Sequence, residues 1–309
     1  MLDPETAGDP MSEHKWVRIS LRRLSERLQQ AGHAACPTTV GRLLRKHHYS
    51  PKANQKSEAG KDHPDRNTQF EYLAAQKAAF LAAGAPVISV DTKKKELIGN
   101  FKNAGQAWCQ RPEAVNLHDF PQDAIGRAVP YGIYDLARQQ GFVAIGHSAD
   151  TPQFAVESIG AWWQAEGHTA YPEATQLLIL ADSGGSNGCR PRAWKQQVQE
   201  QLCDRFGLEV TVCHYPTGCS KYNPIEYRLF SPISIHWAGK PLRTFETMAA
   251  CIRGTVTKAG LSVQALLLQG TYPTGQSVSK IEMSRLHLHL HAVCPRWNYT
   301  ITPRFADTG

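Results

Sequence analysis

The stretch Pro86-Val-Ile-Ser-Val-Asp91 predicts a buried β-strand that ends in a carboxylate. A second apolar run, Leu177-Leu-Ile-Leu-Ala-Asp182, ends in the same way. A carboxylate at the end of a buried strand costs free energy unless it is paired or holds a cation. Two such strands in one chain therefore favour a cation-binding site.

A third acid, Glu226, lies just inside a helix predicted to begin at Asn223-Pro224. Carboxylate oxygens suit Mg²⁺ or Mn²⁺, which keep some water and take their other ligands from protein and substrate phosphates. Two such ions about 4 Å apart stabilise the attacking and leaving oxygens of an in-line phosphoryl transfer. Asp91, Asp182 and Glu226 are therefore the candidate catalytic residues and metal ligands of an enzyme that cuts and joins DNA strands.

Each acid also has a local alternative. Asp91 and Asp182 could cap the turns that follow their strands, since Asp bonds nearby backbone N–H groups well. With Asn223 as N-cap and Pro224 in the first helical position, Glu226 stands where a capping box places its Glu. Taken singly, these local roles remain open.

The positive charge of the chain is concentrated in one segment. The formal net charge is +7 over 309 residues, whereas residues 15–56 alone carry +9 from ten Lys or Arg and one Glu. Such an excess of positive charge predicts that this segment binds a polyanion. The rest of the chain is slightly acidic, so the basic character is confined to the segment.

The same segment predicts two short helices. Ser20 can cap the first, with Leu residues at 21, 24 and 28 on one face and Gly32 at its end. The second begins at Pro37, with Val40, Leu43 and Leu44 on its buried side. Such a pair is the outline of a DNA-binding helix-turn-helix, and a solvated helical hairpin is the alternative. The candidate DNA contacts on the second helix are Arg42, Arg45 and Lys46.

The organisation predicted from these patterns has two domains. Residues 1–66 form the helix-turn-helix region and a polar linker, and residues 67–309 form the catalytic domain, which opens with a helix over 68–83. The catalytic domain is predicted to belong to the α/β class. Strands are predicted at 87–90, 96–101, 142–145, 177–180 and 208–213, with helices at 154–165, 193–206 and from 224. In this arrangement 96–101 is the hairpin neighbour of 87–90.

Along the chain the predicted order is strand, strand, strand, helix, strand, helix, strand, helix. This is the order of a ribonuclease H-like fold, a mixed sheet flanked by helices. In that topology the first and fourth strands are adjacent, which would bring Asp91 and Asp182 together.

Long motifs of the chain resemble those of the Rhodopirellula-type DDE transposases, the ISAzo-thirteen-like insertion-sequence group. The motifs are residues 86–105, His118-Asp-Phe120, Pro130-Tyr-Gly-Ile-Tyr-Asp135, Asp182-Ser-Gly-Gly-Ser-Asn-Gly188 and Ser220-Lys-Tyr-Asn-Pro-Ile-Glu-Tyr-Arg-Leu-Phe230. Asp9-Pro-Met-Ser and His63-Pro-Asp-Arg also fit, so the resemblance runs from about Leu2 to Pro303.

The resemblance implies a ribonuclease H-like catalytic domain and metal-dependent DNA transposition, with Asp91, Asp182 and Glu226 as the triad. It implies two Mg²⁺ or Mn²⁺ ions, element ends and target DNA as partners, and a homo-oligomer on DNA. Two alternatives remain. One is a DNA-binding remnant that represses without cutting, and the other is a ribonuclease H-like nuclease without strand transfer.

The chain departs from the family pattern at a few positions. Tyr222, Pro224 and Tyr227 stand where Trp, Lys and His are typical, and Ser183 stands where Gly is typical. The family usually has further residues before the motif at 2–12, so an N-terminally shortened copy is expected. All three acids are kept.

Lys93, Lys94 and Lys95 follow the first acid and could contact DNA phosphate or form a solvated turn. The alternating residues His287, His289 and His291 predict one face of a half-exposed strand, with metal binding as the lesser alternative.

The remaining candidates favour structural roles. Trp162 and Trp163 are expected in the core. Cys189, Cys213, His214 and Cys219 lack the spacing of a zinc site. Eight scattered cysteines in so long a chain predict reduced thiols. No apolar run approaches the ~18 residues of a membrane helix, and no secretory signal is recognised, so a cytoplasmic, nucleoid-associated protein is expected.

Overall fold

The computed structural model describes residues 6–8, 15–17, 19–51 and 63–304. The chain forms two compact units, Met1–Glu58 and Ala59–Gly309. The Asp9-Pro-Met-Ser motif and most of the predicted linker lie outside the described residues. In the described part of the chain, no helix is long and apolar enough to cross a membrane.

The first unit contains the two predicted helices, α1 (Leu21–Gln30) and α2 (Pro37–Lys46), and an antiparallel pair of strands that was not predicted, β1 (Thr6–Gly8) and β2 (Lys15–Val17). Ser20 caps α1 as expected, because its Oγ accepts from the backbone N of Arg23 at 3.2 Å. Gly32 ends the turn after α1 with a φ of 83°. Two helices with a turn are therefore confirmed.

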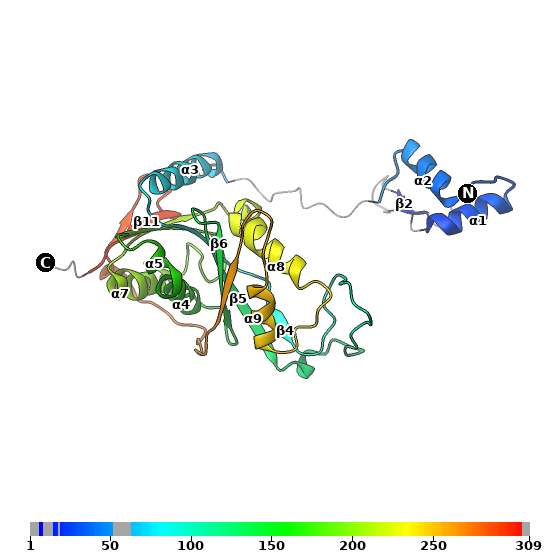
Figure 1. Ribbon diagram of the computed structural model, residues 1–309. Coiled ribbons are helices and arrows are strands. Elements are labelled where there is room, and N and C mark those ends of the chain that lie inside the picture. The colour runs from blue at the N-terminus through cyan, green and yellow to red at the C-terminus, as the bar shows by residue number, and fades with distance from the viewer. Residues whose placement is uncertain (1–5, 9–14, 18, 52–62, 305–309) are drawn as a thin grey trace. The chain divides into compact units, whose positions relative to one another are not determined.

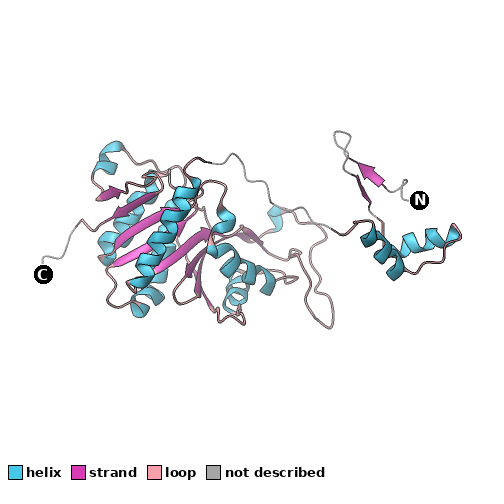
Figure 2. Cartoon of the chain, turned by 90° about the horizontal axis from the view of Figure 1, so that it is seen from above, coloured by secondary structure: helices cyan, strands magenta, loops and turns pink. Residues whose placement is uncertain are grey.

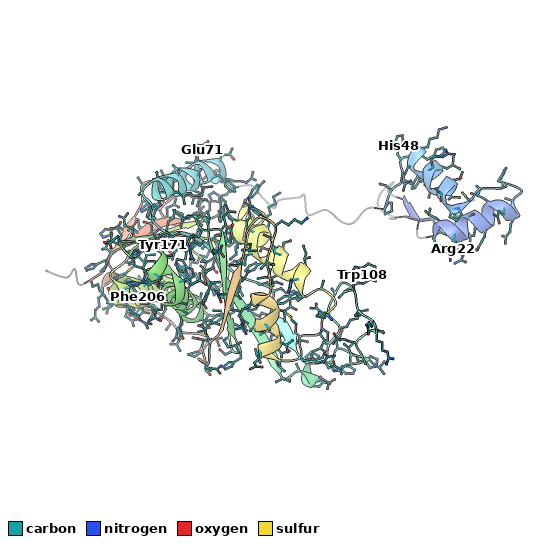
Figure 3. The ribbon with its side chains drawn as sticks, viewed as in Figure 1. Arg22, His48, Glu71, Trp108, Tyr171 and Phe206 are labelled. Atoms are coloured by element: carbon teal, nitrogen blue, oxygen red, sulfur yellow. The ribbon has the colours of Figure 1, made fainter. Side chains whose placement is uncertain are left out.

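The apolar seam between these helices is narrower than predicted. Leu24 and Val40 are 5% and 2% exposed, so they form the buried contact. Leu43 was expected on the buried side of α2 but is 41% exposed, which is a correction. Two helices can cover only one stripe of each other's surface, and Leu43 faces away from that stripe. Arg22 of α1 and His48 after α2 are also exposed (Figure 3).

The second unit is built on one large mixed sheet with the strand order β10-β11-β8-β7-β3-β5-β6-β9 (Figures 1 and 2). Its strands are β3 (Val87–Thr92), β4 (Glu96–Ile98), β5 (Gly126–Asp135), β6 (Gln140–Gly146), β7 (Gln176–Ala181), β8 (Glu209–His214), β9 (Val263–Leu267), β10 (Leu288–Leu290) and β11 (Asn298–Ile301). β3, β5 and β6 run antiparallel, whereas β3, β7 and β8 run parallel. The order β6-β5-β3-β7-β8 is the ribonuclease H-like arrangement, so the predicted fold class is confirmed.

One predicted strand pairing is wrong. Residues 96–101 were expected to form a hairpin with β3, but β4 pairs with the first half of β5. The antiparallel neighbour of β3 is the second half of β5, a strand that the sequence did not predict. Gly126, Pro130 and Gly132 interrupt the apolar pattern of β5, and glycine and proline normally argue against a central strand.

Helices cover both faces of this sheet. On one face Phe154 of α4 (Pro152–Trp162) and Trp194 of α6 (Arg192–Val198) join Ile88 and Val90 of β3 in the largest core cluster. On the other face α3 (Arg66–Ala82) packs Leu73 against Val87 and Leu178, and α9 (Phe245–Arg253) packs against β6 and β9. α3 and α4 accordingly lie on opposite sides of the sheet in Figure 1.

The helices of this unit are α3 (Arg66–Ala82), α4 (Pro152–Trp162), α5 (His168–Ala170), α6 (Arg192–Val198), α7 (Asp204–Phe206), α8 (Ser231–His236), α9 (Phe245–Arg253) and α10 (Lys280–Ser284). Wider π-helical turns continue α4 at Trp163–Gly167 and α6 at Gln199–Cys203, and precede α8 at Glu226–Phe230. Short 3₁₀ turns occur at Pro121–Asp123 and Ser220–Tyr222. Trp162 and Trp163 are buried as predicted.

Candidate metal centre at the ends of β3 and β7

The two strand-end acids are neighbours across a parallel strand pair. β3 and β7 pair with Val90 opposite Ala181, so the next residues in register are Asp91 and Asp182. Side chains alternate between the two faces of a strand, so these acids share the face on which Val87 and Leu178 pack against α3. The predicted adjacency of Asp91 and Asp182 is therefore confirmed.

Glu226 begins the π-helical turn Glu226–Phe230, on the same face of the sheet. Ile225 and Phe230, at the two ends of this turn, are buried with Val143 and Ile145 of β6. The helix is thus anchored on both sides of the acid, while the Glu226 side chain itself is exposed. Its charge acts on both Asp91 and Asp182, which places the three acids in one electrostatic group.

Asn223 connects this helix to both strands. Its Nδ2 donates to Asp182 Oδ1 at 3.0 Å and to the carbonyl oxygen of Val90 at 3.4 Å. Its Oδ1 accepts from the hydroxyl of Ser89, and that hydroxyl accepts from the backbone N of Ile225 at 3.2 Å. Because the Asn223 side chain is engaged in this way, it makes no N-cap hydrogen bond, and the capping-box alternative for Glu226 is wrong.

The carboxylates repel one another. Burial raises the pKa of Asp91 to about 8, and the charge of Asp182 is the next largest cause. The charges of Glu226 and Asp150 add to the rise, while the backbone N of Thr92, which donates to Asp91 Oδ1 at 2.8 Å, opposes it. The local turn-capping role considered for Asp91 therefore exists, but it does not offset the crowding of negative charge.

The pKa of Asp182 is shifted in the same direction as that of Asp91. Burial raises its pKa, the charge of Glu226 adds to the rise, and the hydrogen bond from Asn223 lowers it. Buried carboxylates that share a site are stabilised by a cation, and an all-oxygen donor set suits Mg²⁺ or Mn²⁺. Among the described residues no three metal-ligating side chains converge tightly enough to form a complete site. The donor chemistry fits a divalent ion on condition that the side chains close around it.

Asp150 is a fourth acid at this site that sequence reasoning missed. It precedes Thr151, the N-cap of α4, and its Oδ1 accepts from Thr92 Oγ1 at 3.1 Å. Asp182 directly follows β7, whereas Asp150 is separated from the end of the buried strand β6 at Gly146, so the strand-end pattern in the sequence is weaker for Asp150.

Tyr131 lines the same region from β5. It lies opposite Thr92 in the strand pair, and its hydroxyl is buried without a hydrogen-bond partner among the described residues. Burial raises its pKa well above the ordinary value, and the charges of Asp91 and Asp150 raise it further. The hydroxyl therefore stays protonated and is a hydrogen-bond donor close to the acids.

The three lysines after Asp91 lie in different environments. Lys93 is 10% exposed, lies 3.6 Å from Glu96 and places its Nζ 4.7 Å from the centre of the Trp237 ring. Lys95 lies 3.9 Å from Asp150, and Lys94 is exposed. The arrangement separates Lys93, which is held in the protein, from the two outer lysines.

The other candidate ligands have structural partners. His291 lies between the Tyr72 hydroxyl at 2.7 Å and Thr300 Oγ1 at 2.8 Å. His287 and His289 bond to residues 303 and 302. In the described part of the chain these histidines form no metal-binding group.

The residues considered for zinc are also structural. His214 is buried, which lowers its pKa to about 4, and its Nδ1 lies 2.9 Å from the carbonyl oxygen of Asp182. Burial raises the pKa of the Cys213 thiol to about 12. A neutral imidazole beside the backbone of residue 182 fixes the end of β7.

Comparison with known proteins gave one family and a set of solved structures. The family model described as the Rhodopirellula transposase DDE domain matches residues 1–303. No curated protein matches. Among solved structures, the Mos1 transposase paired-end complex with left transposon end is 14% identical with a TM-score of 0.44.

The mariner Mos1 paired-end complex with Mg is 13% identical, also with a TM-score of 0.44. In both comparisons the match covers 74% of this chain and 64% of the Mos1 chain.

Proposed function

The chain belongs to the Rhodopirellula transposase DDE domain family, and from this premise we propose that it is an insertion-sequence transposase that cuts and joins DNA strands. The observation that carries the proposal is the pairing of β3 with β7, which sets Asp91 beside Asp182 on the face where Glu226 lies. The mutual repulsion of these acids supports a cation-dependent reaction.

Asp91, Asp182 and Glu226 would hold two Mg²⁺ or Mn²⁺ ions. When bound, such ions activate the attacking oxygen and stabilise the leaving oxygen of a phosphoryl transfer. Asn223 would keep one oxygen of Asp182 oriented by its hydrogen bond, which leaves the other free to bind. Asp150 would orient Thr92, the residue next to Asp91.

DNA would be held by two parts of the chain. The region 1–66 would supply duplex affinity through the exposed residues Arg42, Arg45 and Lys46 of α2. In the catalytic domain, residues 67–309, Lys94 and Lys95 could contact phosphate, whereas Lys93 is better suited to support the loop through Trp237 and Glu96. Element ends and target DNA are the proposed partners, with a homo-oligomer on the nucleoid as the acting form.

Strand cleavage and strand joining test this proposal together. A labelled duplex with the DNA that flanks the reading frame is incubated with the full chain and Mg²⁺, then resolved on a denaturing gel. We expect nicked and joined products that disappear with EDTA and with Asp182→Asn, and that persist with Asp123→Asn, a matched change at an exposed turn.

Each alternative gives a different result. Binding without any cleavage would identify a DNA-binding remnant. Cleavage without joining would identify a nuclease. If Asp182→Asn cleaves DNA at the same rate as the unmodified protein, the catalytic role assigned to the acids is wrong.

A further inference from the structure

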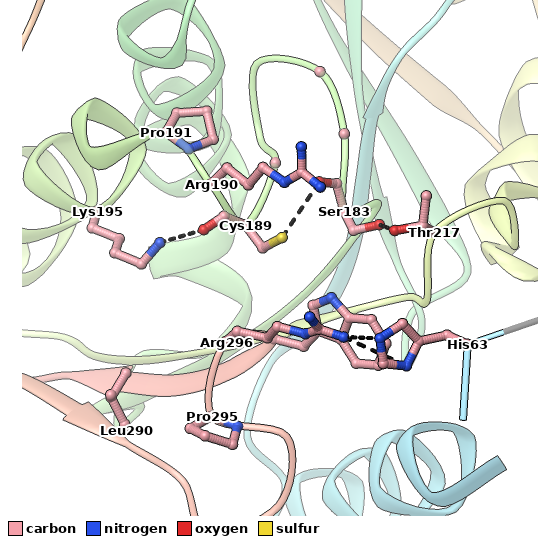
Figure 4. Close-up of a pocket in the computed structure, with 14 residues that line it drawn as sticks. His63, Ser183, Cys189, Arg190, Pro191, Lys195, Thr217, Leu290, Pro295 and Arg296 are labelled. Atoms are coloured by element: carbon pink, nitrogen blue, oxygen red, sulfur yellow. Dashed lines mark hydrogen bonds between the residues drawn. The ribbon is translucent and has the colours of Figure 1, made fainter. Parts of the chain in front are cut away.

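A second site lies next to the carboxylates, in a groove of about 920 Å³. Figure 4 shows one wall formed by the loop from Ser183 to Pro191 and the other by Pro295, Arg296 and His63. We call it the Arg190 groove, and its further lining residues are Lys195, Thr217, Leu290 and Trp297.

The charge of the Arg190 groove is one-sided. The cations Arg190, Lys195 and Arg296 line it, and none of the described residues that line it is acidic. Arg190 and Arg296 come from opposite walls and are exposed. A groove with cations on both walls attracts an extended anion more strongly than a flat surface of the same charge, because the low-dielectric walls focus the field.

Two of the three cations, Lys195 and Arg296, are held in place by the protein. Lys195 Nζ donates to the carbonyl oxygen of Cys189 at 2.6 Å and lies 4.9 Å from the centre of the Tyr299 ring. Arg296 lies 4.6 Å from the centre of the Trp297 ring and is hydrogen-bonded to His63. Side chains fixed in this way lose little conformational entropy when a ligand binds.

The groove begins at the residue that follows Asp182 in the chain. Ser183, which follows Asp182, lines it and lies 3.2 Å from Thr217 through the two hydroxyl oxygens. At Gly184 and Gly185 an added Cβ would meet no atom within 4 Å, so this wall is open to a close approach by a ligand. A strand bound at Asp182 could therefore continue along the groove.

We propose that the Arg190 groove binds the phosphodiester backbone of one DNA strand that leads away from the acids. This rests on the proposed function, because it takes DNA as the substrate. Trp297 is only 2% exposed and offers no surface for base stacking, so recognition is through phosphate and is independent of sequence.

The test measures binding of a fluorescent single-stranded oligonucleotide to the full chain across a salt series in EDTA. The groove variant is Arg190→Gln with Arg296→Gln. The matched control is Arg127→Gln with Lys258→Gln, which removes the same charge at exposed positions outside the groove. Each phosphate contact to a single strand contributes about 0.7 to the log–log salt slope, so the slope of the groove variant should fall by about 1.4 and that of the control should not change.

Equal slopes for the groove variant and the unmodified protein, or equal reductions in variant and control, would overturn the proposal. If the double variant does not fold, Arg190→Gln alone is measured instead, because Arg190 is exposed. The salt slope should then fall by about 0.7. Because the measurement needs no metal and no cleavage, its result is separate from that of Asp182→Asn. The salt series can refute DNA binding in the groove while the catalytic assignment stands. The cleavage assay can likewise refute the catalytic assignment while the groove proposal stands.

Discussion

Asn223 Nδ2 donates a hydrogen bond to Asp182 Oδ1 over 3.0 Å, and so ties the start of the Glu226 helix to the second strand-end acid. The same side chain accepts from Ser89 on β3. One buried amide therefore fixes the relative positions of all three elements that supply the acids. The geometry of the site depends on a residue that carries no charge.

Asn223→Ala should lower both stability and activity. Ser89 and Asp182 would each lose a buried hydrogen bond, at a cost of about 1–3 kcal/mol of unfolding free energy. Loss of a group that orients a metal ligand typically costs 10–100-fold in activity or metal affinity, and we expect cleavage to fall by about that factor. Denaturant unfolding and the gel assay measure the two effects.

Asn116→Ala is the control for this change, because Asn116 is half-buried and bonds to Asn100 away from the acids. It should leave cleavage unchanged. Normal cleavage by Asn223→Ala would mean that Asp182 keeps its position without the amide.

Gly132→Ala should displace the helix that carries Glu226. Gly132 lies opposite Asp91 in the β3–β5 pair, and a Cβ there would collide with the Phe230 ring and lie 3.0 Å from Ile225 Cδ1. Overpacking of this kind costs about 1–3 kcal/mol, and the shifted helix should reduce cleavage as well. Thermal unfolding and the gel assay report on the two consequences.

The same substitution at Gly160 has the opposite expected sign. Gly160 lies in α4, and its added Cβ would find the nearest atom at 3.6 Å, an ordinary contact. Alanine should stabilise the helix by up to about 1 kcal/mol and leave cleavage intact. A Gly132→Ala protein as stable and active as Gly160→Ala would show that the strand and helix are not tightly packed.

Asp91→Asn should change how stability depends on pH. The folded protein raises the pKa of Asp91 from an ordinary value of 3.8 to about 8, so it binds this proton more tightly than the unfolded chain does. Stability without metal therefore falls as pH rises between these two values, by up to about 1.4 kcal/mol per pH unit. The variant lacks this pH-dependent decrease and should unfold at higher temperature than the unmodified protein at pH 8.

Unfolding temperatures measured from pH 4 to pH 8 in EDTA test this expectation, with Asp123→Asn as an exposed control. The two curves should converge near pH 4, and added Mg²⁺ should stabilise the unmodified protein more than Asp91→Asn. Parallel curves at all pH values would mean that Asp91 is ionised without cost.

The sequence predicted the two acids of the sheet because both follow buried apolar runs, and their adjacency then followed from the strand order. β5 was missed for a reason that bears on the site. Gly132 disturbs the strand pattern, yet its missing side chain leaves room for Ile225 and Phe230. The residue that conceals the strand is the one that allows the Glu226 helix to approach.

Other parts of the site depend on interactions between distant segments. Asn223-Pro224 has the local signature of a helix cap, and only the fold reveals that its amide binds Asp182 instead. Lys93, Lys94 and Lys95 are equivalent in sequence, and the ring of Trp237 distinguishes Lys93 from its neighbours. Local patterns cannot predict such pairings, because they carry no information on which distant side chain will be near.

Replacing Arg42, Arg45 and Lys46 with Ala should weaken duplex binding. All three side chains are exposed on α2, outside the seam formed by Leu24 and Val40, so the helices should stay folded. Removing one cation that binds a phosphate should reduce the log–log salt slope by about 0.9, which gives a reduction of roughly two to three units if all three residues bind phosphate. Binding of a fluorescent duplex across a salt series measures the slope.

A control that removes three exposed charges from the second unit separates this effect from general electrostatics. Its substitutions are Arg127→Ala, Arg205→Ala and Lys258→Ala. The control should keep the slope, because segment 15–56 carries more positive charge than the whole chain. If the α2 variant keeps its affinity and slope, the helical unit does not hold the duplex. The second unit would then have to bind it, with Lys94 and Lys95 as the proposed phosphate contacts.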